Sequence, residues 1–223
     1  MTLAERAIAV HEKLIEYYGR PEWRNPLPPV AELVSTILSQ NTNDTNRDRA
    51  FEALRARFPN WEQVRDADLE EVIDAIRVAG LANQKGPRIQ NALRKITEER
   101  GQLSLEFLRD MEVREARHWL MQLKGVGPKT AAIILLFSLD MPAFPVDTHV
   151  HRVTGRIGLR PDSMNADNAH EHLANLLPEG SYYAAHLNLI RLGREICAAR
   201  KPKCPQCPLQ ELCDYYADKY AES

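Results

Sequence analysis

The 223-residue sequence contains no apolar run long enough to span a bilayer, and its first residues already mix charged and apolar side chains. We therefore expect neither a membrane protein nor a secreted one, but a cytoplasmic protein. A positive charge balance is also absent, because 31 acidic residues outnumber 29 Lys and Arg and the pI is about 6.4. Many nucleic-acid-binding proteins are strongly basic, so such binding would here need a local basic surface.

Strand patterns are missing as well. No stretch alternates polar and apolar residues with an excess of β-branched side chains, and the sequence has no repeats and no low-complexity segment. The predicted fold class is therefore all-α. The length allows one large domain or two small ones with real cores.

Helical spacing of apolar residues, with capping residues before and glycines after, predicts the helices. One gap between them, Pro26-Leu27-Pro28-Pro29, is expected to be a linker. The expected helices cover about 3–18, 30–39, 44–58 and 68–79, a segment with Ile89, Leu93 and Ile96 that closes at Gly101, and a segment capped by Ser104. A pair around residues 119–136 follows, and then 147–157, 166–177 and 181–199.

Cysteine is rare, and the four cysteines lie together in the pattern Cys-x6-Cys-x2-Cys-x5-Cys. Because cytoplasmic thiols stay reduced, this cluster favours a metal site over disulfides. Structural zinc usually joins two closely spaced pairs, and only Cys204 and Cys207 form one here. A [4Fe-4S] cluster also takes four thiolates, although this is not the ferredoxin spacing. The pattern leaves both open and slightly favours iron-sulfur; its ligands would be Cys197, Cys204, Cys207 and Cys213.

Basic residues surround these cysteines, and they predict either a clamp on an anionic partner or an ordinary solvated face. They are Arg191, Arg194, Arg200, Lys201 and Lys203.

A Gly-x-Gly turn stands at the centre of the chain, between two short helical patterns. We expect positive φ at Gly125 and Gly127, and Pro128 at the first position of the following helix. Backbone amides at such a turn suit a DNA phosphate, although an ordinary helix connection looks the same. Lys129, in the first turn of the second helix, is the candidate nucleophile.

Three motifs together resemble endonuclease III of the helix-hairpin-helix DNA glycosylase superfamily. They are Leu123-x-Gly125-Val126-Gly127-x-Lys129-Thr130-Ala131, then Val146-Asp147-Thr148-His149, and then the four cysteines. The resemblance covers nearly the whole chain.

The resemblance implies a six-helix barrel domain at residues 22–144, with the helix-hairpin-helix, and an all-helical iron-sulfur cluster domain formed by residues 1–21 and 145–223. The four cysteines would hold a [4Fe-4S] cluster. Lys129 and Asp147 would face each other across a cleft between the domains. The implied partner is double-stranded DNA with a damaged base or an abasic site, bound by a monomer that is associated with the nucleoid in a prokaryote.

The implied activity is base-excision repair: removal of oxidised pyrimidines through a Schiff base at Lys129, followed by β-elimination at the abasic site. An amine that attacks C1′ must be unprotonated, and a first-turn position and burial both favour that form. Asp147 could accept the amine's proton and stabilise positive charge on the sugar. The simpler roles are a phosphate-contacting lysine and a helix N-cap.

A base inside duplex DNA must be flipped out and its gap filled. Two family loops with this task match Gln40-Asn41 and Leu81, and either Gln40 or Asn41 could enter the stack. Leu81 could also be a simple hydrophobic contact after Gly80. The implied DNA-binding residues are Gln40, Asn41, Leu81, Lys124, Gly125, Val126, Gly127, Thr130 and His149.

Other positions bear on DNA recognition. Lys85 and Arg88 are expected to grip the DNA backbone or to face water. The sequence departs from the family at Pro128, where a basic residue is frequent, at Lys124, where proline is frequent, and at His151, often an apolar aromatic. These departures concern phosphate contacts and base preference.

Three alternatives stay open at this point: an enzyme that acts mainly as an abasic-site lyase, a mismatch or adenine glycosylase of the same fold, and a noncatalytic DNA-binding iron-sulfur module. A lysine at position 129 speaks against the second. The combination of Lys129 with Asp147 speaks against the third, since binding alone needs neither.

Overall fold

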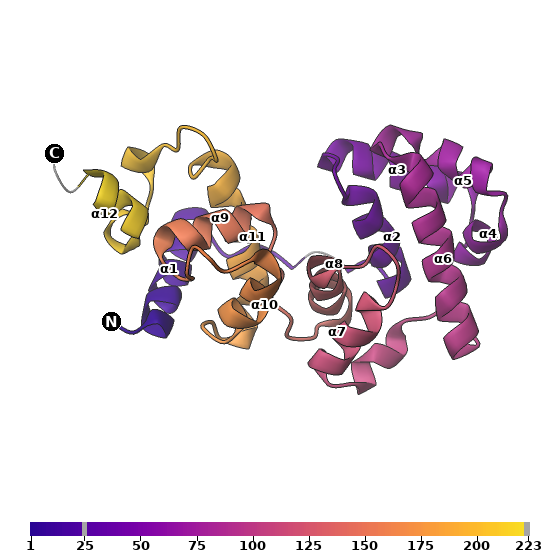
Figure 1. Ribbon diagram of the computed structural model, residues 1–223, viewed down its shortest axis with the longest axis horizontal. Coiled ribbons are helices and arrows are strands. Elements are labelled where there is room, and N and C mark those ends of the chain that lie inside the picture. Colours follow the sequence, from indigo (N-terminus) through magenta and orange to yellow (C-terminus); the bar gives the residue numbers. More distant parts are fainter. Residues whose placement is uncertain (24–25, 221–223) are drawn as a thin grey trace. The chain divides into compact units, whose positions relative to one another are not determined.

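The computed structural model describes residues 1–23 and 26–220, and the chain divides into two compact units (Figure 1). One unit is Pro26–Met141, and the other combines Met1–Asn25 with Pro142–Ser223. The regular elements of the described residues are all helices, which confirms the all-α prediction. None of these helices has the length and apolar character that crossing a bilayer requires.

The unit Pro26–Met141 carries the hairpin. Its elements are α2 (Pro29–Ser39), α3 (Asp44–Arg57), α4 (Trp61–Asp66), α5 (Leu69–Ala75), the 3-10 turn Arg77–Ala79, α6 (Ala82–Arg100), the 3-10 turn Glu106–Asp110, α7 (Val113–Met121), α8 (Pro128–Ile133) and a π-helical turn, Ile134–Ser138.

Helix α6 is the long helix of this unit, and α2, α4 and α5 pack against it (Figure 1). Its apolar stripe includes Ile89 and Leu93, which are fully buried together with Leu33 and Ile37 of α2. Burial of such side chains contributes roughly 1.5–3 kcal/mol each. Helices α5 and α6 approach closely at Gly86, where an added Cβ would lie 2.8 Å from a side-chain carbon of α5.

The second unit joins the two ends of the chain. Its elements are α1 (Leu3–Tyr18), α9 (Thr148–Ile157), α10 (Ala166–Ala174), the 3-10 turn Glu179–Ser181, α11 (Tyr182–Glu195), the 3-10 turns Cys204–Gln206 and Gln210–Leu212, and α12 (Asp214–Tyr220).

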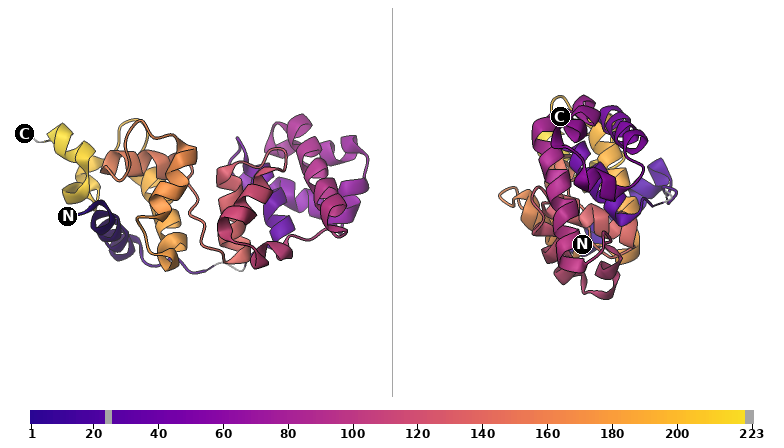
Figure 2. Two further views of the ribbon diagram at one scale, coloured as in Figure 1. Left: turned by 60° about the horizontal axis from the view of Figure 1, so that its bottom comes forward. Right: turned by 90° about the vertical axis from the view of Figure 1, so that its right-hand side faces the viewer.

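Helix α1 brings the N-terminal segment into this unit. It begins at a capping box, in which Thr2 and Glu5 bond each other's backbone amides. Helix α1 packs on α11, and Arg6 reaches the end of the chain, where it donates to Leu212 O and pairs with Asp214 at the start of α12. Figure 2 shows α1 and α12 side by side.

Capping residues set several boundaries as expected. Asn43 accepts from Asn46 N and begins α3, and Asp68 accepts from Glu70 N and begins α5. The expected helix at 181–199 was too long, because α11 ends at Glu195 and the chain then bends, with Cys197 N bonded to Leu192 O at 2.7 Å. Sequence spacing missed α4 and α12, which have six and seven residues.

Candidate active site

The hairpin lies between α7 and α8, as predicted. Gly125 has φ +91°, a left-handed value that favours glycine, and Val126 N closes the turn on Leu123 O at 3.0 Å. The expected positive φ at Gly127 was wrong. Gly127 is the N-cap of α8 with φ −98° and ψ −179°, because an N-cap residue adopts extended backbone before the helix begins.

Lys129 stands in the first turn of α8, one residue after Pro128 at the helix start. Its side chain is exposed, whereas its neighbour Thr130 and the hairpin residue Val126 are buried. The burial that the sequence interpretation invoked is thus not provided by the Pro26–Met141 unit itself. What the unit does provide is a primary amine on a rigid helix start directly after the hairpin.

Gln40 ties the end of α2 to the hairpin. Its Nε2 donates to the carbonyl oxygen of Gly125 at 2.8 Å, and its Oε1 accepts from Arg88 Nη1 at 3.1 Å. The side chain of Arg88 also packs against the hairpin, since a Cβ at Gly125 would lie 2.8 Å from Arg88 Cδ. Gln40, Arg88 and Gly125 therefore form one contact network within the unit.

Asn41 and Leu81 share an unusual backbone conformation. Their φ values are +52° and +49°, in the left-handed region that non-glycine residues seldom adopt. Both side chains are exposed, Leu81 to 46%. Leu81 is the residue before α6, so its side chain projects from a turn and not from a helix face.

Lys85 was expected to grip the DNA backbone or to face water, and the structure shows that this expectation was wrong. Its side chain is 1% exposed, and its ammonium donates to Leu38 O at 2.7 Å and to Ala79 O at 2.8 Å. Desolvation lowers the pKa of Lys85, and the positive charge of Arg88 adds to this effect. The physical reason for the error is helical register, which places position 85 on the buried stripe of α6 with Ile89.

Asp147 is the N-cap of α9, in the other unit. Its Oδ1 accepts from Val150 N at 2.7 Å, and the residue is partly exposed. No second hydrogen bond to this carboxylate occurs within residues 1–23 and 26–220. Asp147 therefore caps α9 through Oδ1, and its Oδ2 is left for another interaction.

Two histidines follow on α9, and both are packed within their unit. Nδ1 of His149 lies 3.1 Å from Arg152 Nη2, and the His149 side chain packs on α11 at Gly193. His151, the departure from the family pattern, bonds Met164 O through Nε2 and lies against Arg160 through Nδ1. Its ring nitrogens are thus both engaged in structure.

The four cysteines meet in one pocket. All of them line it, together with apolar parts of Ile196, Pro202 and Tyr215, and no disulfide joins them. Burial, the largest cause, together with the neighbouring thiols raises the pKa of the Cys207 thiol to about 11. Among the described residues no group of His, Cys, Asp or Glu is gathered tightly enough to hold a metal ion.

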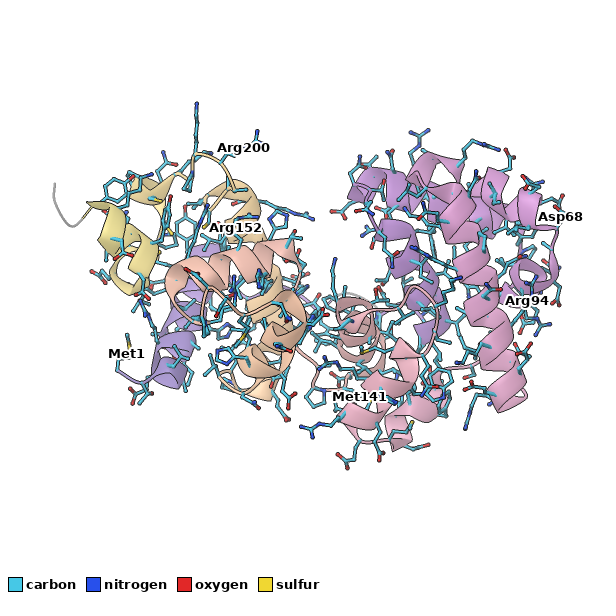
Figure 3. The ribbon with its side chains drawn as sticks, in the orientation of Figure 1. Met1, Asp68, Arg94, Met141, Arg152 and Arg200 are labelled. Carbon is cyan, nitrogen blue, oxygen red and sulfur yellow. The ribbon has the colours of Figure 1, made fainter. Side chains whose placement is uncertain are left out.

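Arg156 of α9 links the cysteine loop to the rest of its unit. Its guanidinium lies 3.4 Å from Cys197 Sγ and donates to the carbonyls of Ala198 and Ala199. Arg200, Lys201 and Lys203 are exposed on this loop, and Figure 3 shows Arg200 on its outside.

Arg191, which the sequence grouped with the basic residues of this loop, is engaged elsewhere. It pairs with Glu195 at 3.0 Å and stacks on the ring of Tyr18.

The structure thus brings together the hairpin, Gln40 and Arg88 in one unit, and the cysteines in the other. The opposition of Lys129 and Asp147, which belong to different units, stays a prediction.

Lys85 and Arg156 were missed as organising residues. A lysine in register with the apolar stripe of α6 was a readable signal for the first, whereas nothing in the sequence marks Arg156.

Comparison with known proteins identifies the family. The model of the HhH-GPD superfamily base excision DNA repair proteins matches residues 34–179. A candidate DNA glycosylase of Arabidopsis thaliana is 38% identical over 187 residues, which are 79% of this chain and 64% of the plant protein. This chain thus spans less than two thirds of that longer relative.

Endonuclease III of Sulfolobus acidocaldarius is 33% identical over 190 residues, covering 84% of this chain and 82% of the archaeal one. A solved structure of a trapped covalent intermediate between endonuclease III and DNA superposes with a TM-score of 0.82 at 26% identity, covering 98% of this chain and 99% of that one. Because a family model matches more than half of its length and a relative at 33% identity covers 84% of it, the chain belongs to the HhH-GPD superfamily of base excision DNA repair proteins.

Proposed function

We propose that this protein is a bifunctional DNA glycosylase and abasic-site lyase that removes oxidised pyrimidines from double-stranded DNA. The observation that carries the proposal is the exposed amine of Lys129, fixed in the first turn of α8 directly after the hairpin. An amine there is superfluous for binding through backbone amides, but it is the group that a covalent mechanism needs. The related endonuclease III has been trapped as a covalent intermediate with DNA.

In this proposal the hairpin amides around Gly125 and Gly127 hold a phosphate, and Lys129 Nζ attacks C1′ of the flipped nucleotide. The bond from C1′ to the base breaks, and its electron pair leaves with the base. The nitrogen loses a proton, and the sugar ring opens as the C1′–O4′ bond breaks with its electron pair on O4′, which takes up a proton. The nitrogen lone pair forms the C1′=N bond of the Schiff base. This acidifies the C2′ proton, and its removal expels the 3′ phosphate by β-elimination.

Asp147 supplies negative charge for the same reaction. Since Oδ1 is held by Val150 N, the carboxylate has a fixed orientation at the start of α9. We propose that its other oxygen accepts the proton of the Lys129 amine and stabilises positive charge on the sugar as the base leaves. Both groups belong to one chain, so the proposal requires only a monomer.

We further propose that Cys197, Cys204, Cys207 and Cys213 hold a [4Fe-4S] cluster. The donor set fits, because four thiols line one pocket and no His, Asp or Glu is among the described residues that line it with them. A tetrahedral zinc ion would need all four sulfurs around one point, whereas a four-iron cluster separates its ligands. The cluster would supply a rigid cross-link for the loop that displays Arg200, Lys201 and Lys203, which we propose contacts DNA.

The test is incision of duplex oligonucleotides that carry thymine glycol, an abasic site or a mismatch. We expect strand cleavage at the first two substrates. Lys129→Gln should reduce cleavage by on the order of 10³-fold or more, because it removes the nucleophile. Lys13→Gln, which removes a partly exposed lysine paired with Glu211, is the matched control and should leave cleavage unchanged.

Three outcomes would overturn the proposal. Cleavage of the abasic site alone would indicate a lyase-dominant enzyme. Base release at mismatches without strand cleavage would indicate a monofunctional glycosylase. DNA binding without any reaction would indicate a noncatalytic module.

A further inference from the structure

Two exposed turns of the Pro26–Met141 unit share a strained backbone. Asn41 follows α2 and Leu81 precedes α6, and both have left-handed φ values near +50°. A non-glycine residue in this region is strained and persists where its surroundings impose it. Something in the structure must therefore hold each turn.

Lys85 holds both turns at their bases. Its ammonium is buried and donates to Leu38 O, three residues before Asn41, and to Ala79 O, two residues before Leu81. A buried ammonium is costly unless it is well bonded, so this contact fixes the distance between the two carbonyls. One side chain thus sets the spacing of the Asn41 and Leu81 turns.

Gln40 connects the Asn41 turn to the hairpin. Both ends of its amide are used, with Nε2 on Gly125 O at 2.8 Å and Oε1 on Arg88 Nη1 at 3.1 Å. A glutamine held in this way has no free amide to place in a base stack. The Asn41 side chain, by contrast, is exposed and makes no hydrogen bond within the described part of the chain.

We propose that Gln40 and Lys85 are positioning residues, which hold the Asn41 turn, the Leu81 turn and the hairpin at fixed spacing as one DNA-reading frame. Gln40 then holds the Asn41 turn in place, and this leaves the Asn41 side chain free for the gap-filling task that the family resemblance implies for this loop. The inference rests on the proposed function, because it assigns Gln40 a role in handling damaged duplex DNA.

The experiment compares wild type with Gln40→Leu, Arg88→Met, the double variant and Gln63→Leu. Gln63→Leu is the matched control, since Gln63 is an exposed glutamine on α4. Two quantities are measured: the single-turnover incision rate at an abasic site, and the fluorescence of 2-aminopurine placed opposite an abasic-site analogue that cannot be cleaved. Anisotropy confirms that each complex forms.

For Gln40→Leu we expect a tenfold or greater loss of incision rate and loss of the 2-aminopurine response, with unchanged affinity for undamaged duplex. Arg88→Met should lose less, because the bond to Gly125 O remains. The double variant should be no worse than Gln40→Leu, since residues of one network are not additive. Gln63→Leu should match wild type in both measurements.

Wild-type rate and fluorescence in Gln40→Leu would overturn the inference, and so would additive losses in the double variant. If Gln40→Leu does not fold, the fluorescence response of Arg88→Met decides, and a wild-type response there overturns the inference. Absence of incision by the wild-type protein would instead contradict the proposed function, so the two failures are distinguishable.

Discussion

At the scale of single residues, Asp147 combines two roles that can be separated. Asparagine caps a helix about as well as aspartate, because its side-chain oxygen also accepts from the backbone amide. It carries no charge, however. The helix start and the catalytic charge therefore depend on different properties of the same side chain.

Asp147→Asn should keep the melting temperature within a few degrees of wild type and lower base removal by about 10²–10⁴-fold, the usual contribution of a general acid or base. Asp147→Ala should lose activity and also about 1 kcal/mol of stability, since the cap to Val150 N disappears. Thermal melts and single-turnover base release measure the two effects. Full activity of Asp147→Asn would show that the residue is only a cap.

His11 is a titratable residue that has no part in the proposed reaction. It borders an apolar cavity of α1 and α11, and its Nδ1 is buried without a hydrogen-bond partner among the described residues. Desolvation lowers the pKa of His11 below 6.5, and Arg20 adds to this effect while Glu12 opposes it. Below pH 6.5 the unfolded chain therefore binds more protons than the folded one.

Stability that depends on neutral His11 is thus present above pH 6.5 and is lost as pH falls through the lowered pKa of the folded state. His11→Phe removes this titration and suits the apolar cavity. We expect the melting temperature of the variant, relative to wild type, to rise steadily from pH 7 to pH 5. A difference that does not change with pH would contradict this account.

At the scale of elements, the backbone of the hairpin requires glycine at position 125 but not at position 127. Gly125 has positive φ and packs under Arg88, whereas Gly127 has extended backbone and no atom near the place of a Cβ. The two glycines look equivalent in the sequence. Only Gly125 is fixed by sterics.

Gly125→Ala should therefore destabilise the protein by about 1–2 kcal/mol, from left-handed strain alone, and disturb the contact between Gln40 and Gly125 O. Gly127→Ala is the matched control and should cost well below that, because its backbone is open to any residue. Denaturant unfolding of both variants gives the comparison. Equal losses would refute the asymmetry.

The positions of many helices and of the hairpin could be predicted from the sequence. Apolar spacing and caps located α1, α3 and the hairpin, because these signals act within one or two helical turns. The burial of Lys85 could be read from its register on α6, but the contacts that Lys85, Gln40 and Arg156 make with carbonyls far away in the chain could not be predicted. The Lys85 ammonium bonds Leu38 O, 47 residues earlier, and no local pattern encodes that contact.

At the scale of the whole molecule, the loop that carries the four cysteines, residues 197–213, packs against the helices of the unit formed by both chain ends. Residues from α9, α12 and the loop meet around the four thiols, and Arg156 donates to the loop carbonyls of Ala198 and Ala199. A group bound there would therefore support a large part of this unit.

Cys207→Ser should remove a ligand and with it the proposed cluster. We expect wild-type protein to be brown, with broad visible absorption and about four irons, and the variant to be colourless with a lower melting temperature. Visible spectra and metal analysis measure this outcome. Colourless wild-type protein with stoichiometric zinc would contradict the iron-sulfur assignment.

The central claim is that Lys129 is the nucleophile, and trapping tests it most directly. The protein is incubated with a duplex containing an abasic site in the presence of borohydride, and the adduct is digested and located by mass spectrometry. We predict one covalent adduct, on the peptide that contains Lys129, absent from Lys129→Gln and retained in Lys13→Gln. An adduct on another amine, or none while DNA is bound and cut, would contradict the account.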